Sequence, residues 1–135
     1  MKKRFPSKLK SIDRDDACAE LRQLQKSIET AETIAVIGGG AVGVELAGDI
    51  ASYYPKKDVT LIHSRERLLP RFGRKLHEHV FDVFSKLGVR MILGQRPRLS
   101  NNAGDEKGGS LKYSDGRIQT YNLIVSCVKV FHVDA

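Results

Sequence analysis

Three glycines, at positions 38, 40 and 43, have the types and spacing needed to bind a phosphate group. Gly38 permits a tight turn, Gly40 lets a pyrophosphate approach the backbone, and Gly43 lets a helix lie close to the preceding strand. Free N–H groups at the start of that helix would point at the phosphates. The G-x-G-x-x-G pattern therefore predicts a dinucleotide site. The alternative is an ordinary strand-to-helix turn that binds no ligand.

The segments around the glycines are those that such a site requires. Residues 34–37 are a short apolar run, typical of a buried strand, and Val42, Leu46 and Ile50 share one face of a helix after the turn. A second apolar run at Val59–Ile62 completes a βαβ unit of the expected size. This context makes the glycine spacing specific, because three glycines alone are a weak signal.

The residue about 20 positions after the last glycine, at the end of the second strand, discriminates between cofactors. A carboxylate there would hold the ribose hydroxyls and repel a 2′-phosphate. Hydrogen-bond donors and positive charge are found there instead, on His63, Ser64, Arg65 and Arg67. NADP is therefore favoured. NAD is the alternative, because a small shift of the loop would bring Glu66 to the ribose.

Other residue types that could do chemistry give weaker signals. Glu45 lies in the first turns of the predicted helix, where it either faces a nicotinamide or only complements the helix dipole. His77 and His79 lack the i, i+4 spacing of a metal pair, and we expect both to be solvated. No serine stands in a nucleophile elbow. We therefore predict no catalytic side chain and no metal site.

Composition limits the remaining function classes. The chain has 135 residues, which predicts one domain, and its net charge of +7 is carried by residues 56–98. This surplus either attracts anions or forms a solvated basic face. Without an aromatic platform, a helix-turn-helix or a zinc signature, no specific nucleic-acid partner is expected. The sequence contains no signal peptide or long apolar run, so we expect a soluble cytoplasmic chain, and no disulfide between Cys18 and Cys127.

The rest of the chain continues the α/β pattern. We predict a helix over residues 13–30 capped by Asp13, a helix over 73–87 ended by Gly88, and a third strand at Val89–Leu93. A polar loop over 101–110, a hairpin around Asp115-Gly116 and a buried strand at Leu123–Val125 follow. Together these segments predict a three-layer α/β, Rossmann-like fold whose mainly parallel sheet carries a β-meander.

The stretch from Ile34 to Phe72, with the following helix and LGVRMILG, resembles the NAD(P)H-binding domain of flavoproteins that bind two dinucleotides. The resemblance covers residues 31–126 and is strongest to the branch related to apoptosis-inducing factor, of the ferroptosis-suppressor type, with type II NADH dehydrogenases as more distant relatives. In this family the domain is inserted into a larger FAD domain. Hydride passes from the nicotinamide to the flavin and then to a quinone-like acceptor.

The resemblance implies a set of residues that contact NADP or NAD, with Arg65 flanking the adenosine 2′ position. They are Gly38, Gly39, Gly40, Ala41, Val42, Gly43, Glu45, His63, Ser64 and Arg65.

The chain also departs from the family pattern. No G-x-G-x-x-G for FAD precedes Ile34, and Lys129 stands where the family usually has a small residue and a glycine. We therefore expect a truncated chain made of a basic arm (1–12), a linker helix (13–30), the NAD(P)H-binding domain (31–128) and a tail (129–135). It is either the NAD(P)H-binding part of an FAD-dependent oxidoreductase, with the FAD domain as its missing partner, or a non-catalytic dinucleotide-binding module. A weaker alternative is a basic surface that binds nucleic acid or membranes.

Overall fold

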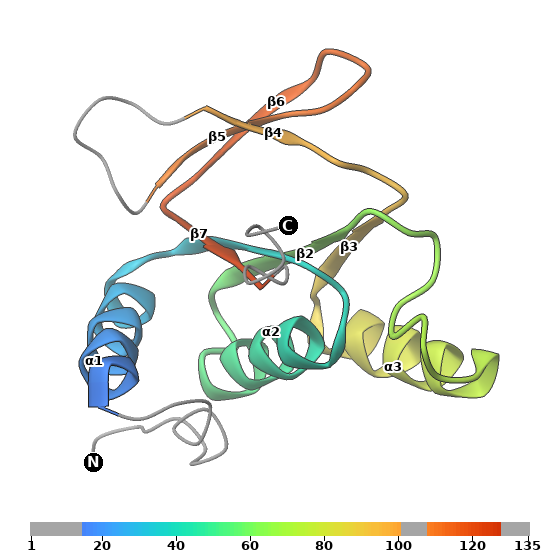
Figure 1. Ribbon diagram of the computed structural model, residues 1–135, viewed down its shortest axis with the longest axis horizontal. Coiled ribbons are helices and arrows are strands. Elements are labelled where there is room, and N and C mark those ends of the chain that lie inside the picture. Colours follow the sequence, from blue (N-terminus) through green and yellow to red (C-terminus); the bar gives the residue numbers. More distant parts are fainter. Residues whose placement is uncertain (1–14, 101–107, 128–135) are drawn as a thin grey trace.

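The computed structural model describes residues 15–100 and 108–127, which form three helices and seven strands (Figure 1). The helices are α1 (Asp15–Thr30), α2 (Ala41–Tyr53) and α3 (Arg74–Leu87). The strands are β1 (Thr33–Ile37), β2 (Asp58–His63), β3 (Arg90–Leu93), β4 (Arg98–Ser100), β5 (Gly109–Lys112), β6 (Ile118–Tyr121) and β7 (Leu123–Ser126).

Four strands form a parallel sheet in the order β3-β2-β1-β7. Val36 in the central strand β1 is aligned with Leu61 of β2 on one side and with Val125 of β7 on the other. Because the strands are parallel, their carboxyl ends meet at one edge of the sheet. The glycine-rich turn after β1 and the segment after β2 are therefore neighbours at that edge.

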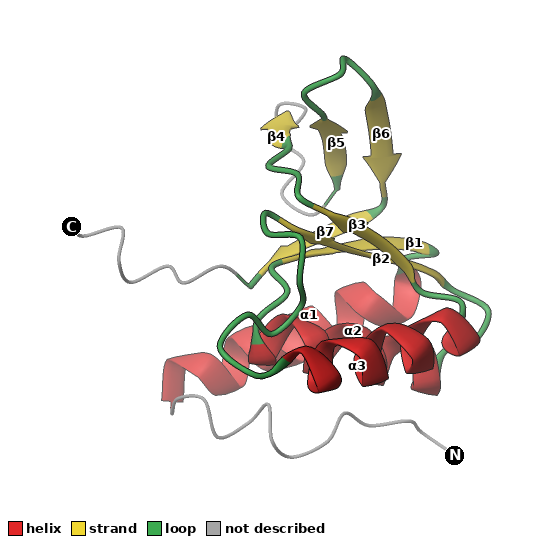
Figure 2. Ribbon diagram, turned by 90° about the vertical axis from the view of Figure 1, so that its right-hand side faces the viewer, coloured by secondary structure: helices red, strands yellow, loops and turns green. Residues whose placement is uncertain are grey.

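The molecule has three layers (Figure 2). All three helices cover one face of the parallel sheet, and the antiparallel strands β4, β5 and β6 form a meander over the other face. One apolar core lies between the helices and the sheet, and a second lies between the sheet and the meander. Burial on both faces explains why the strands β1, β2 and β7 are apolar runs rather than alternating patterns. The three-layer α/β fold predicted from the sequence is confirmed.

The predicted elements are present with small differences at their ends. Gly88 ends α3 in the left-handed conformation, at φ 83°, as expected. The predicted loop over 101–110 is wrong at Gly109 and Ser110, which belong to β5, and β4, in which Ser100 is aligned with Ser110, was not predicted. Both strands are short and largely polar, so their pairing is decided by the sheet rather than by local preference.

Several predictions fall outside the described residues. These are the basic arm, the Asp13 cap, the part of the predicted loop at 101–107, and the tail at 129–135.

Candidate functional site

The glycine-rich turn leaves the amino end of α2 open. Gly38 has φ 119°, in the region that favours glycine, and its N–H donates to the Ile62 carbonyl oxygen at 2.7 Å. Gly40 is the N-cap of α2 and supplies no side-chain cap, and a Cβ placed on it would meet nothing within 4 Å. The first N–H groups of a helix have no partner within the helix. The turn therefore presents free backbone donors next to open space.

Gly43 brings α2 against the turn. A Cβ placed on Gly43 would lie 1.7 Å from the Gly38 carbonyl oxygen, a distance at which two atoms cannot coexist. The same Cβ would be 3.6 Å from Cβ of Cys127, which follows β7. Only glycine permits this approach of helix and turn. The contact fixes the position of the helix N-terminus relative to the end of β1.

Gly39 is held by the segment that follows β2. Its N–H donates to Nδ1 of His63 at 2.8 Å, and its carbonyl oxygen accepts from the Leu69 N–H at 2.8 Å. A Cβ on Gly39 would lie 2.6 Å from Cγ of His63 and 2.9 Å from a methyl group of Leu68. The turn is therefore anchored from the side, at a residue that lies between the first two glycines of the pattern.

The orientation of His63 differs from the sequence-based expectation. The half-buried imidazole accepts a hydrogen bond from Gly39, whereas we expected it to offer a donor to a 2′-phosphate. Burial, and then the positive charge of Arg65, lower the pKa of His63. Its Nε2 is buried and has no hydrogen-bond partner among the described residues. The ring is therefore neutral at physiological pH, with the proton on Nε2.

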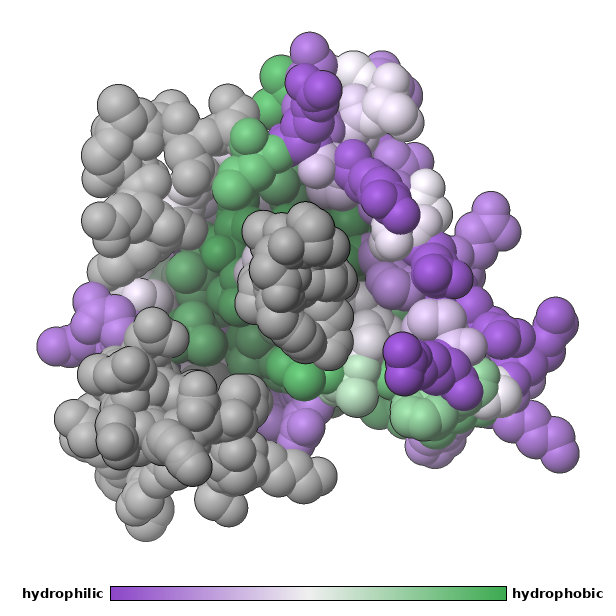
Figure 3. All heavy atoms as spheres, viewed as in Figure 1, coloured by the Kyte–Doolittle hydropathy of each residue, from purple (hydrophilic) through white to green (hydrophobic). Residues whose placement is uncertain are grey.

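Charged side chains after β2 line an open recess of about 610 Å³. Its lining residues are Arg65, Glu66, Arg67, Pro70, Arg74, His77 and Glu78. Ser64 and Arg65 are exposed beside it, and the Glu66 side chain lies against Gly94. The donors that favour a 2′-phosphate and the carboxylate that favours a ribose therefore occupy the same short segment. In Figure 3 hydrophilic residues gather on the side of the molecule where α3 lies, and hydrophobic residues gather over the middle.

The remaining predicted residues lie on α2. Ala41 and Val42 are exposed at the start of the helix, and Glu45 is half-buried one turn later. Their positions agree with a ligand lying across the amino end of α2.

Residues 64–73, which we call the strap, are packed structure, which was not predicted from the sequence although some of their charged side chains were. Leu68 is fully buried, and Leu69 adopts a left-handed conformation at φ 49°, which is uncommon for a branched side chain. The expectation that His77 is solvated is wrong, because its Nδ1 accepts a hydrogen bond from the Leu68 N–H at 2.9 Å. The apolar Leu68-Leu69-Pro70 run within a polar segment is the signal that could have identified the strap as packed structure.

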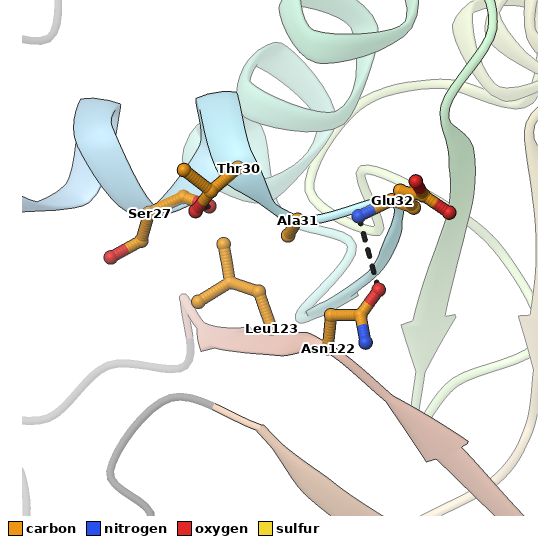
Figure 4. A pocket seen from close by; sticks show the side chains of 6 residues that line it. All are labelled: Ser27, Thr30, Ala31, Glu32, Asn122 and Leu123. Atoms are coloured by element: carbon orange, nitrogen blue, oxygen red, sulfur yellow. Dashed lines mark hydrogen bonds between the residues drawn. The ribbon is translucent and has the colours of Figure 1, made fainter.

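A second hollow, of about 380 Å³, lies at the opposite edge of the sheet, between the end of α1 and the start of β7 (Figure 4). Asn122 lies there, and its Oδ1 accepts from the N–H groups of both Glu32 and Thr33 at 3.0 Å. The hydroxyls of Ser27 and Thr30 donate to carbonyl oxygens of their own helix. Asn122 thus ties the start of β7 to the start of β1, and the two hydroxyls are used within α1, so the polar groups of this hollow serve the fold.

Within residues 15–100 and 108–127, we find no helix with both the length and the hydrophobicity needed to cross a membrane.

Comparisons with known proteins agree on one family. The pyridine nucleotide-disulphide oxidoreductase family matches residues 5–130. Fe-regulated protein 8 of Mycosarcoma maydis is 46% identical over 109 residues, which are 80% of this chain and 27% of that protein. Ferroptosis suppressor protein 1 of Xenopus tropicalis is 31% identical over 129 residues, which are 91% of this chain and 34% of that protein.

A solved structure also resembles the fold. The water-forming NADH oxidase from Lactobacillus brevis, bound to NADH, superimposes with a TM-score of 0.71 at 25% identity, and the match covers 82% of this chain and 24% of that one. The chain thus spans about a third or less of the length of these proteins.

Proposed function

Because the chain belongs to the pyridine nucleotide-disulphide oxidoreductase family, we propose that it forms the NAD(P)H-binding part of an FAD-dependent oxidoreductase. The observation that carries this proposal is the uncapped amino end of α2, which opens beside Gly40 and is held against the turn by the contact at Gly43. A pyrophosphate fits this arrangement, because backbone donors face a space that no side chain fills.

The described residues suggest how a dinucleotide would lie. The N–H groups of Ala41, Val42 and Gly43 would bind the pyrophosphate, and Gly38, Gly39 and Gly40 would give it access to the backbone. Glu45 would lie on the nicotinamide side. Ser64 and Arg65 would lie on the adenosine side, at the recess after β2. His63 lies between the two groups, and its position against Gly39 links them.

We propose NADP as the preferred cofactor and NAD as the alternative. Arg65 and Arg67 face the recess, and a guanidinium there would pair with a 2′-phosphate. The competing feature is Glu66, which lines the same recess and could instead accept hydrogen bonds from ribose hydroxyls.

Calorimetric titration of the chain with NADPH and NADH tests this preference. We expect NADPH to bind at least as tightly as NADH, and Arg65→Ala to weaken NADPH binding by about 1 to 3 kcal/mol, the range for losing a charge-assisted hydrogen bond. Arg90→Ala is the matched control, because Arg90 lies at the amino end of β3 near Asp58 and should not affect either cofactor. A clear preference for NADH would refute the 2′-phosphate site and favour Glu66 as the ribose ligand.

In a longer protein of this family, we propose that hydride passes from the nicotinamide to a flavin and then to a quinone-like acceptor. FAD supplies the electron-accepting chemistry, and the residues described here would hold and orient the nicotinamide dinucleotide. The 135-residue chain alone would then bind the dinucleotide without turnover.

Two measurements test whether the chain alone binds the dinucleotide without turnover. Visible absorption of the purified chain reports bound flavin, and NADPH oxidation with a quinone acceptor reports turnover. Stoichiometric FAD with sustained turnover would overturn the proposal. The alternative of a non-catalytic binding module would be supported if the neighbouring coding sequence supplies no FAD fingerprint.

A further inference from the structure

Two histidine rings flank the strap, and one holds the glycine-rich turn while the other holds the strap itself. His63, the last residue of β2, accepts the Gly39 N–H on its Nδ1 at 2.8 Å. His77, in the first turn of α3, accepts the Leu68 N–H on its Nδ1 at 2.9 Å. Between these bonds, the Leu69 N–H donates to the Gly39 carbonyl oxygen at 2.8 Å. The glycine-rich turn, the strap and α3 are thus connected by three consecutive hydrogen bonds.

The packing of the strap shows that these three hydrogen bonds belong to one defined conformation. Leu68 is fully buried, and one of its methyl groups lies 2.9 Å from the position that a Cβ of Gly39 would occupy. Leu69 is 7% exposed and adopts a left-handed backbone conformation, which leucine keeps only when its surroundings require it. The Phe72 N–H donates to the Leu69 carbonyl oxygen and closes the turn. The strap is therefore packed structure whose shape depends on its anchors.

An imidazole accepts a hydrogen bond only when it is neutral, because both nitrogens of the protonated ring are donors. Protonation of His63 would place an N–H group opposite the Gly39 N–H. It would replace an attraction by a repulsion where the glycine-rich turn is anchored.

The charged groups around the two rings can be named. Arg65, on the same segment as His63, disfavours a second positive charge there, and burial of the ring acts in the same direction on the pKa of His63. Gly39 donates to the ring, Leu68 lies beside the same glycine, the Gln95 N–H donates to the His63 carbonyl oxygen, and Leu93 of β3 is aligned with His63; these four neighbours are uncharged. Around His77 lie the charged residues of the recess, and its ring is 5.8 Å from that of Phe81. Those charged residues are Arg65, Glu66, Arg67, Arg74 and Glu78.

We propose that His63 and His77 are positioning residues of the dinucleotide site: as hydrogen-bond acceptors they hold the strap and the glycine-rich turn in their binding conformation, and they do not contact the bound phosphates. Protonation of the His63 ring therefore weakens dinucleotide binding. This inference rests on the proposed function, since it assumes that the turn binds a dinucleotide. It gives His63 a different role from the direct contact that the sequence suggested.

The sign of the pH effect separates the two roles of His63. A histidine that contacts phosphate as a cation binds more tightly as the pH falls, whereas a neutral anchor binds less tightly. NADH is the appropriate probe, because it lacks the 2′-phosphate, which itself titrates near pH 6. Because the His63 ring must be deprotonated for binding, the dissociation constant rises at most about tenfold per pH unit below the pKa of His63.

The experiment compares the NADH dissociation constant of the 135-residue chain and its variants from pH 8.0 to 5.5. Asparagine places Oδ1 close to the position of Nδ1 and does not titrate, so His63→Asn and His77→Asn should bind within about threefold of the wild-type chain at pH 8, and His63→Asn should give a flatter pH profile. His63→Leu removes the acceptor and should weaken binding about tenfold at pH 8. His79→Asn is the matched control, since His79 is exposed on the same helix, and it should keep the wild-type profile.

A measurement without ligand separates failure of this proposal from failure of the proposed function. Imidazole ¹⁵N chemical shifts of the ligand-free chain at pH 8 should show both rings with the proton on Nε2 and an accepting Nδ1. If the chain binds no NADH at pH 8, the proposed function fails, and the shifts still test the anchors. Protonated Nδ1 atoms, tighter binding of NADH on acidification, or loss of binding in a folded His63→Asn variant would each overturn the anchor role.

Discussion

Gly43→Ala adds a single methyl group at the most crowded point of the dinucleotide site. The new Cβ would lie 1.7 Å from the Gly38 carbonyl oxygen, whereas real Cβ contacts under 3.0 Å essentially never occur. The obstructing atom belongs to the backbone and cannot rotate away, so α2 or the turn must move by more than 1 Å. Overpacking of this kind costs about 1 to 3 kcal/mol, and the rigid neighbour places Gly43→Ala at the upper end of that range.

Helix propensity alone predicts that Gly43→Ala stabilises the protein, because alanine is favoured over glycine within a helix by about 1 kcal/mol. The clash exceeds this gain, so we expect a net loss of about 2 kcal/mol in the free energy of unfolding. For a domain of this size, that loss lowers the melting temperature by roughly 6 to 10 °C. Thermal and urea unfolding followed by circular dichroism would measure it, and NADH titration should show weakened binding.

Two alanine substitutions in the same region serve as controls. At Gly48, also in α2, a Cβ would be 3.3 Å from the edge of the Phe84 ring, which can shift slightly, so stability should change by less than about 1 kcal/mol. At Gly40 a Cβ would meet nothing, so Gly40→Ala should leave stability nearly unchanged and weaken dinucleotide binding, because the methyl group occupies the path of the pyrophosphate. If Gly43→Ala melts at the same temperature as Gly48→Ala, the steric account of Gly43 is refuted.

Three further predictions concern groups elsewhere in the fold. Asn122→Ala should lower the free energy of unfolding by about 1 to 2 kcal/mol, since Oδ1 accepts two backbone hydrogen bonds, and Asn122→Asp, which keeps the acceptors, should lose less in urea unfolding. Burial raises the pKa of Cys127 to about 11. In a Cys18→Ser chain at pH 8, a thiol reagent should therefore modify Cys127 far faster after unfolding in urea than in the folded state. Equal rates would contradict the burial of this thiol. The pKa of His63 is lowered on folding, so its contribution to stability is present above pH 6.5 and is lost as the pH falls below that value; pH-dependent urea unfolding should show a flatter curve for His63→Asn than for the wild-type chain.

The sequence predicted the parallel sheet because its strands carry their own signals. Each of β1, β2 and β7 is a short apolar run bounded by residues that end strands, and Gly88 marks the end of α3. The meander was only partly predictable. Leu99 in β4 is aligned with Leu111 in β5, yet Leu99 is 54% exposed and its neighbours are polar, so no local pattern distinguishes β4 from a loop.

For the site, the sequence predicted the positions but not the orientations. The backbone positions of the glycines follow from their spacing, because turn geometry allows few alternatives. The orientation of His63 does not, since an imidazole can donate outward or accept inward, and the choice depends on Gly39 and Leu68 lying beside it. The same holds for His77, whose partner is a backbone N–H nine residues earlier in a segment without secondary structure.

The position of β7 next to β1 has a consequence for how the chain folds. The hydrogen bond from Gly39 to His63 spans 24 residues, whereas the bond from Glu32 to Asn122, beside the β1–β7 pair, spans 90. Closing the longer loop costs only about 1 kcal/mol more in chain entropy, so it hardly affects stability. It affects the order of events, because contacts between distant residues form slowly. On the ribosome, β1, α2 and β2 can assemble early, while one edge of β1 stays exposed until β7 has been synthesised, and in that interval the growing chain is vulnerable to pairing with another chain through that edge.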